Sequence, residues 1–179
     1  AEKFHDLFKT SINFDNLEDM RTHSIQSAIE YSKNTQNLFL EFGVYKGNSA
    51  NFISGLIKEQ NLYAFDSFNG LKDDWKGGFF GKYFFDLEGK IPKLNNNIIV
   101  VKGWIEETLD DFIKINLKNT NKKISFIHID TDTYETSSFV LKNLKPFLAK
   151  NCIIMFDEIY NFPGWENGEY KSLIENFRE

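Results

Sequence analysis

The sequence predicts an α/β protein with a doubly wound, mostly parallel sheet. Short apolar runs recur along the 179-residue chain, and glycine or an acidic residue follows most of them. Stretches with the helical spacing of apolar residues separate these runs. Such alternation is typical of a parallel sheet whose crossover helices cover both faces. With 41% hydrophobic residues, the chain suits one compact domain over residues 1–179.

The expected elements follow from periodicity. A helical cover over residues 1–35 contains an amphipathic helix at 17–32, on which Arg21 and His23 are expected to be solvated or to cap. Later helices are expected from residue 48 and at 105–117, 136–144 and 169–177. Strands are expected in the run starting at Leu38 and at 62–65, 97–102, 124–129 and 152–156.

The stretch 71–94 is rich in glycine, charge and aromatic residues without clean periodicity. This composition predicts a long mobile loop, since long irregular segments of compact domains are usually functional or disordered. Its aromatic residues suggest a lid or a surface that faces a substrate; they are Trp75, Phe79, Phe80 and Tyr83.

Charge and hydropathy exclude several classes of partner. The net charge is −5 and no stripe of lysine and arginine stands out, so nucleic acid is not expected. No apolar run approaches the roughly 18 residues that cross a bilayer, and no membrane partner is expected. The single cysteine, Cys152, lies in an apolar run and cannot form an internal disulfide, which favours a cytoplasmic location.

The pattern Glu41-x-Gly43-x-x-x-Gly47 closes the first strand and precedes a helix that starts near Asn48. Glycines permit backbone angles closed to other residues, and free N–H groups at a helix start favour polar or anionic groups. The loop is therefore expected to hold a small molecule. The spacing differs from the G-x-G-x-x-G fingerprint of dinucleotide sites. A purely structural glycine turn is the alternative.

Two further positions follow later strands. Asp66 lies about twenty residues beyond the glycine loop, where related folds place an acid on ribose hydroxyls. Its alternative role is to cap a turn with Ser67 and Asn69. Trp104 follows Gly103 at the end of the third strand, where it would stack on an adenine or anchor the next helix.

Acidic residues gather after two neighbouring strands of the predicted sheet. Asp130 and Asp132 follow one strand, and Asp157 and Glu158 follow the next. Carboxylates that converge repel one another unless a cation lies among them, and oxygen ligands favour magnesium, manganese or calcium. Capping of the following helices is the alternative. His128, inside a buried strand, is expected to be a hydrogen-bonded core histidine.

Taken together, the segments EFGVYKGNSA, FDSFNGL, HIDTDTYETS and FDEIYNFPGWENGEYKS resemble the macrocin O-methyltransferase family. This family lies within the class I S-adenosylmethionine-dependent methyltransferases, whose first motif is E/D-x-G-x-x-x-G. The resemblance runs in order from Leu38 to Ser172. It implies a Rossmann-like fold and transfer of a methyl group from S-adenosylmethionine to a sugar hydroxyl of a natural product, with magnesium or manganese.

The resemblance also implies roles for individual residues. Asp132, Asp157 and Glu158 would hold the metal, and Asp132 would accept the hydroxyl proton. Glu158 stands where the family usually has a second aspartate, and the stretch 71–94 contains no histidine to match the family's separate base. The expected cofactor contacts are Glu41, Phe42, Gly43, Tyr45, Gly47, Ser49, Asp66, Ser67, Gly103, Trp104 and Asp130.

Two competing functions are a nicotinamide-dependent oxidoreductase and a non-catalytic cofactor-binding module. The first shares the strand, glycine loop and ribose acid but has no use for the acid cluster. The second is suggested by the chain's stop at Glu179, without the last two strands that methyltransferase sheets usually carry. A homo-oligomer would be one way to complete the side of the site that receives the hydroxyl substrate.

Overall fold

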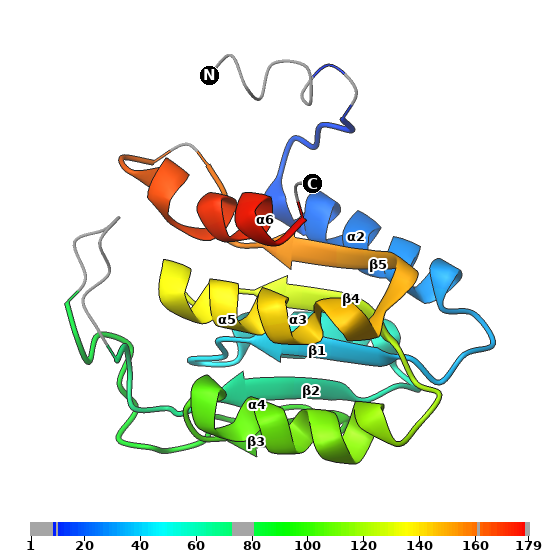
Figure 1. The fold of residues 1–179 in the computed structure, drawn as a ribbon, viewed down its shortest axis with the longest axis horizontal. Coiled ribbons are helices and arrows are strands. Elements are labelled where there is room, and N and C mark those ends of the chain that lie inside the picture. The colour runs from blue at the N-terminus through cyan, green and yellow to red at the C-terminus, as the bar shows by residue number, and fades with distance from the viewer. Residues whose placement is uncertain (1–8, 10, 73–80, 161, 178–179) are drawn as a thin grey trace.

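The computed structural model describes residues 9, 11–72, 81–160 and 162–177. It shows a five-stranded parallel sheet between two layers of helices (Figure 1). The strands are β1 (Leu38–Phe42), β2 (Leu62–Asp66), β3 (Ile98–Lys102), β4 (Ile124–Ile129) and β5 (Leu148–Phe156). The main helices are α2 (Leu17–Tyr31), α3 (Asn48–Ile57), α4 (Ile105–Ile113), α5 (Tyr134–Leu144) and α6 (Glu169–Phe177). The predicted α/β fold is confirmed.

The strand order is β3-β2-β1-β4-β5, and every neighbouring pair is parallel. The chain winds outward from β1 to β3 and then returns to place β4 on the other side of β1. This reversal creates a switch point between β1 and β4. In open α/β sheets, ligands bind at the carboxyl ends of the strands beside such a point.

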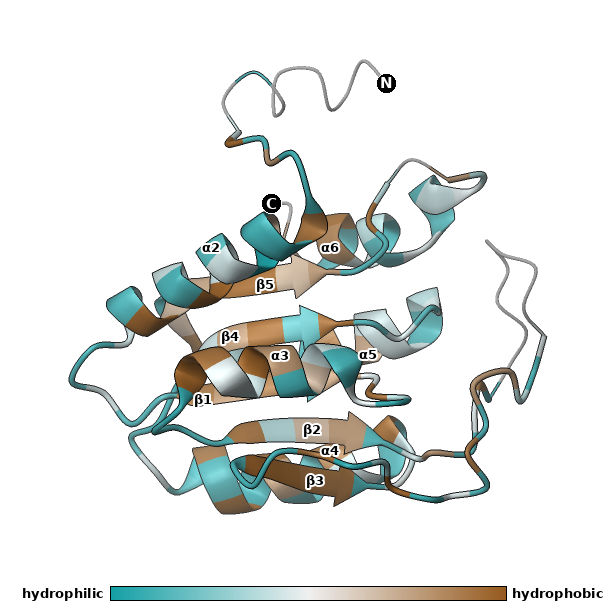
Figure 2. Cartoon of the chain, turned by 180° about the vertical axis from the view of Figure 1, so that it is seen from behind, coloured by the Kyte–Doolittle hydropathy of each residue, from teal (hydrophilic) through white to brown (hydrophobic). Residues whose placement is uncertain are grey.

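Alternation along β1 separates two hydrophobic cores. Leu40 and Phe42 belong to the core under α4 and α5, which also contains Leu109. Phe39 faces the other way, into the core formed with α2 and α3. Figure 2 shows α2 and α3 lying across that second face. Because both faces are covered, the central strands β1 and β4 are buried throughout and are mostly apolar, with Glu41, Ser125 and His128 as the buried polar exceptions.

Several element boundaries differ from the sequence-based expectation. β5 begins at Leu148, before the expected start at Cys152, and α5 begins at Tyr134 because Thr133 caps it by accepting the N–H of Thr136. The helix expected to end at Leu117 is α-helical only to Ile113 and then continues as a π-helical segment, Lys114–Lys118. None of the described helices combines the length and hydrophobicity needed to span a membrane.

The described part of the stretch 71–94 forms backbone hydrogen bonds within itself and to the loop after β2. Leu71 and Phe84 are joined by a backbone hydrogen bond of 3.0 Å, and Tyr83 donates to Leu71 over the same distance. Leu87 donates to the carbonyl of Phe68 and packs into the α2–α3 core. These bonds attach residues 81–94 to the rest of the domain, and the lid role of the stretch 71–94 stays a prediction. The lid residues Trp75, Phe79 and Phe80 lie outside the described residues.

Candidate functional site

A cavity of about 330 Å³ opens at the carboxyl edge of the sheet, across the ends of β1, β2, β3 and β4. Its volume lies in the range of small-molecule sites. The predicted site residues that line it are Gly43, Tyr45, Asp66, Ser67, Gly103, Trp104, Asp130 and Asp132. The predicted residues outside its lining are Glu41, Phe42, Gly47, Ser49, Asp157 and Glu158.

Gly43 is required by the approach of β4 to the glycine loop. It has φ of +89°, and a Cβ added there would lie 1.8 Å from the carbonyl oxygen of Asp130. No side chain fits at that distance, so only glycine lets the ends of β1 and β4 meet. The structural reason for Gly43 is therefore contact between strands. The same residue also lines the cavity.

Asp66 ties the glycine loop to the end of β2. Its Oδ2 accepts the backbone N–H groups of Val44 and Tyr45, each at 2.8 Å, and its Oδ1 accepts that of Phe68 at 2.7 Å. The turn-capping role is thus present. A carboxylate offers about four acceptor positions, so a ligand hydroxyl can still bind beside these three donors. Asp66 therefore has two roles: it holds the glycine loop in shape, and it lines the cavity.

Aromatic side chains form much of the cavity wall. Tyr45, with φ of +48°, packs edge-on against Phe85 with ring centroids 5.0 Å apart. Trp104 lies beneath Lys72, whose Nζ is 5.4 Å from the ring centroid and 3.6 Å from a carboxylate oxygen of Glu106. These rings can stack on a planar ligand. Sequence periodicity gave no signal for Phe85 or Lys72.

Carboxylates crowd the edge of the cavity beyond Gly43. Burial, reinforced by neighbouring acids, raises the pKa of Asp130 to about 7 and that of Asp132 to about 8. The pKa of Glu158 is raised for the same reasons. Glu169, at the start of α6, is also buried, and its pKa rises to about 8. These shifts favour the neutral form of each acid unless positive charge enters the site.

A chain of charged contacts runs from α2 into the sheet. Arg21 donates to Oδ1 of Asp157 at 2.7 Å, and His128 Nε2 lies 3.8 Å from the same oxygen. His128 Nδ1 lies 2.9 Å from Oε1 of Glu41. His128 and Glu41 face each other across β4 and β1, and both are fully buried. The expectation of a hydrogen-bonded core histidine is confirmed, whereas the solvated or capping role expected for Arg21 is wrong.

These contacts set the charge of His128 and Asp157. Burial alone lowers the pKa of His128, but the carboxylates of Asp157 and Glu41 outweigh burial and raise it to about 9. The pKa of Asp157 is lowered, chiefly by His128 and with help from Arg21. Glu41, expected at the cofactor, instead directs its carboxylate to His128 inside the sheet. Asp157 is therefore charged and already faces two cations.

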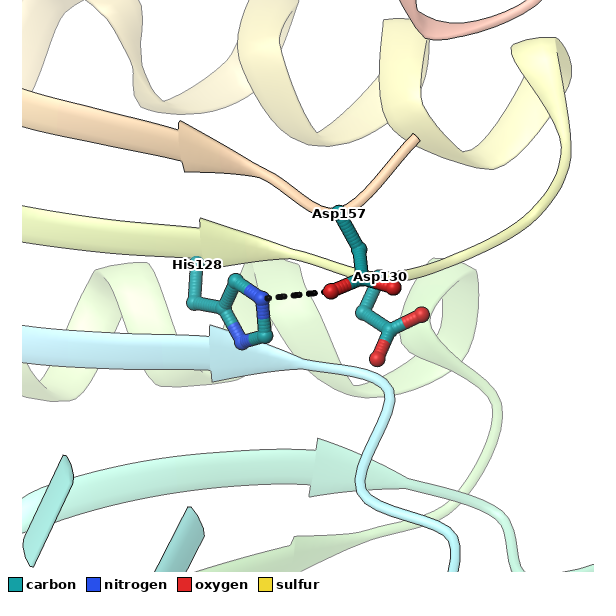
Figure 3. Close-up of side chains that lie close together, drawn as sticks. All are labelled: His128, Asp130 and Asp157. Atoms are coloured by element: carbon teal, nitrogen blue, oxygen red, sulfur yellow. Dashed lines mark ion pairs between the residues drawn. The ribbon is translucent and has the colours of Figure 1, made fainter. Parts of the chain in front are cut away.

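The structure brings together a group of potential metal ligands that differs from the predicted one. Ligand atoms of His128, Asp130 and Asp157 lie within 4.8 Å of one another (Figure 3). In the described part of the chain, Asp132 and Glu158 are not members of this group. Both still interact electrostatically with Asp157. The acids thus occupy one region, but their carboxylates do not all converge on one point.

A family model described as a methyltransferase domain matches residues 40–159. No curated protein matches.

Three solved structures share the fold at low sequence identity. CalS11, a calicheamicin methyltransferase, has a TM-score of 0.67 and 20% identity over 97% of this chain and 81% of its own. The apo form of CalS11, described as a TDP-rhamnose 3'-O-methyltransferase, has a TM-score of 0.60 and 21% identity over 88% of this chain and 69% of its own. The O-methyltransferase NovP has a TM-score of 0.57 and 18% identity over 79% of this chain and 64% of its own.

Proposed function

The chain belongs to the methyltransferase domain family, and on that premise we propose that it transfers a methyl group from S-adenosylmethionine to a hydroxyl of a small molecule. A sugar or glycosylated natural product is the proposed acceptor class, because two similar structures are described as O-methyltransferases, one of them acting on TDP-rhamnose. A magnesium or manganese ion is the proposed second cofactor. The observation that carries the proposal is the cavity joining the glycine loop, Asp66 and the β4 acids.

The residues of the cavity fit S-adenosylmethionine. Asp66 has acceptor capacity for the ribose hydroxyls, and Trp104 offers a ring face for the adenine. Asp130, half-buried beside Gly43, would supply negative charge toward a ligand that carries an ammonium and a sulfonium. When bound, S-adenosylmethionine supplies an electrophilic methyl group on positively charged sulfur. A nicotinamide dinucleotide would place its pyrophosphate against these acids, which argues against the oxidoreductase alternative.

The acids match a divalent cation in their chemistry, and the side chains of Asp132 and Glu158 would have to turn to join Asp157 around one ion. Asp132, Asp157 and Glu158 are the proposed ligands, and oxygen donors of this kind match magnesium or manganese. Positive charge here would offset the burial and the repulsion that together raise the pKa of Asp132 and Glu158. When bound, such an ion supplies Lewis acidity toward a substrate hydroxyl. Ligand atoms of His128 and Asp130 lie within 4.8 Å of one of Asp157 in the same region.

The protein's own contribution to the reaction is placement and proton transfer. Tyr45, Phe85 and Trp104 exclude water from the cavity and orient planar groups. Asp132 lines the cavity, and its carboxylate would accept the proton of the acceptor hydroxyl. A positive leaving group needs little acid assistance. The cytoplasmic location and the homo-oligomer stay predictions.

Calorimetric titration with S-adenosylhomocysteine tests the cofactor site. Trp104→Leu removes the stacking surface, and we expect binding to weaken by roughly tenfold or more. Trp165→Leu, on the short helical turn Trp165–Asn167 outside the cavity lining, is the matched control and should bind as the wild type does. No binding by the wild-type protein, or preferential binding of a nicotinamide dinucleotide, would refute the proposed function.

A second assay tests the acceptor and the cation. Methyl transfer to a panel of nucleotide-linked sugars should require magnesium or manganese and stop in excess chelator. Equal turnover in chelator would remove the cation from the proposal while leaving the methyltransferase assignment in place.

A further inference from the structure

Glu169 is a buried acid that neither the glycine loop nor the predicted acid pairs include. It is the first residue of α6 and only 3% exposed. Its Oε2 accepts the backbone N–H of Glu158 at 3.2 Å, which joins the start of α6 to the residue after Asp157. Its Oε1 is buried and has no hydrogen-bond partner in the described structure. One oxygen is thus used and the other is left over.

The surroundings of that free oxygen are negative. Glu169 interacts electrostatically with Asp130, Asp132 and Glu158, the acids at the ends of β4 and β5. Arg21, the arginine that reaches this region, forms its ion pair with Asp157. A buried carboxylate without a countercharge is unfavourable by several kcal/mol in general. Glu169 therefore either stays neutral or pairs with a cation that enters the site, since the described side chains provide no cation beside it.

We propose that Glu169 is a fourth carboxylate of the cation site, holding Glu158 in place through Oε2 and turning its free oxygen toward the bound ion. The inference rests on the proposed function, because it assumes that Asp132, Asp157 and Glu158 hold a divalent cation. It adds a residue from α6 that lies outside the two strand-end motifs. It also gives the α6 start a role at the site.

A simpler role would be to close the loop between β5 and α6. That role needs only one acceptor for the N–H of Glu158, and a neutral amide oxygen would serve it equally well. Acidic residues also favour the first turn of a helix, but that effect operates at exposed positions too and does not require burial. Neither explanation accounts for a buried second oxygen beside other carboxylates.

The variant Glu169→Gln separates these roles, because glutamine keeps an acceptor for Glu158 and removes the charge. Manganese binding to the full chain would be measured by calorimetry and by electron paramagnetic resonance of free manganese. We expect affinity to fall by about tenfold or more. Without metal, the variant should melt at the wild-type temperature or above it, since repulsion among the acids is reduced.

Glu166→Gln is the matched control, because Glu166 is exposed in the same β5–α6 segment. It should leave manganese affinity unchanged. Wild-type affinity in Glu169→Gln, or a lower melting temperature without metal, would show that Glu169 only closes the loop and would overturn the inference. If the wild-type protein itself binds no manganese, the cation of the proposed function fails instead, and S-adenosylhomocysteine binding still reports on the rest.

Discussion

Replacing Glu41 with glutamine tests the charged pair buried between β1 and β4. The pKa of His128 rises from its ordinary value of 6.5 to about 9, because the carboxylates of Asp157 and Glu41 overcome the opposing effect of burial. One pKa unit corresponds to about 1.4 kcal/mol, so the rise stabilises the fold by about 3 kcal/mol when His128 is protonated. Glu41 supplies part of this, and Glu41→Gln should cost about 1 to 2 kcal/mol near pH 6.

The sign of the pH dependence follows from the direction of the shift. A histidine whose folded pKa is raised contributes its full stability below pH 6.5 and loses it as pH rises through about 9. Near pH 10, His128 is neutral, so the attraction of the imidazolium for Glu41 that the substitution removes is already absent. The difference between the wild type and Glu41→Gln should then shrink toward zero or change sign at about pH 10.

Urea unfolding at about pH 6 and about pH 10 measures the difference in unfolding free energy between the wild type and Glu41→Gln at each pH. Glu30→Gln is the control, because Glu30 pairs with Lys33 on the exposed surface of α2 and should matter by less than about 0.5 kcal/mol at either pH. An equal loss of stability at both pH values would refute the argument, since it would mean that shape and hydrogen bonding, rather than charge, hold the pair together.

Three further outcomes are expected. Gly43→Ala should lower the unfolding free energy by about 3 kcal/mol or more, because its Cβ would strike the Asp130 carbonyl; Gly55→Ala, with no atom within 4 Å of its added Cβ, should be neutral or stabilising in thermal melts. Asp157→Asn should abolish the rise in melting temperature caused by magnesium and spare S-adenosylhomocysteine binding. Asp66→Asn should destabilise the loop by about 1 to 3 kcal/mol and weaken that binding in calorimetry.

The sheet was predictable because each central strand is buried on both faces and ends in a glycine or an acid. Periodicity alone cannot extend a strand into polar residues, so the start of β5 at Leu148 was missed: Lys150 and Asn151 lie at exposed positions of this edge strand. The backbone hydrogen bonds of residues 81–94 could not be predicted for a related reason. Its backbone bonds to residues near Phe68 join segments that no local pattern connects.

The candidate site was predictable as far as position along a strand determines position in space. Gly43, Asp66 and Asp130 end parallel neighbours, and the structure places all three around one cavity. Side-chain direction was harder to predict. Glu41 lies two residues before Gly43, yet its side chain follows the strand alternation into the sheet, where His128 lies in register with it. Position along the strand thus predicted that Glu41 lies near the site, and the register between β1 and β4 determined that its side chain contacts His128.

The distribution of positive charge explains why the cavity edge favours cationic ligands. Of the described residues, the two cations that reach the acids are Arg21 and His128, and both face the same oxygen of Asp157. Asp157 consequently keeps its charge, whereas Asp130 and Asp132 remain crowded and have raised pKa values. The uncompensated negative charge lies on the cavity side of Asp157. A sulfonium beside Asp130 and a divalent ion beside Asp132 would each relieve part of that repulsion.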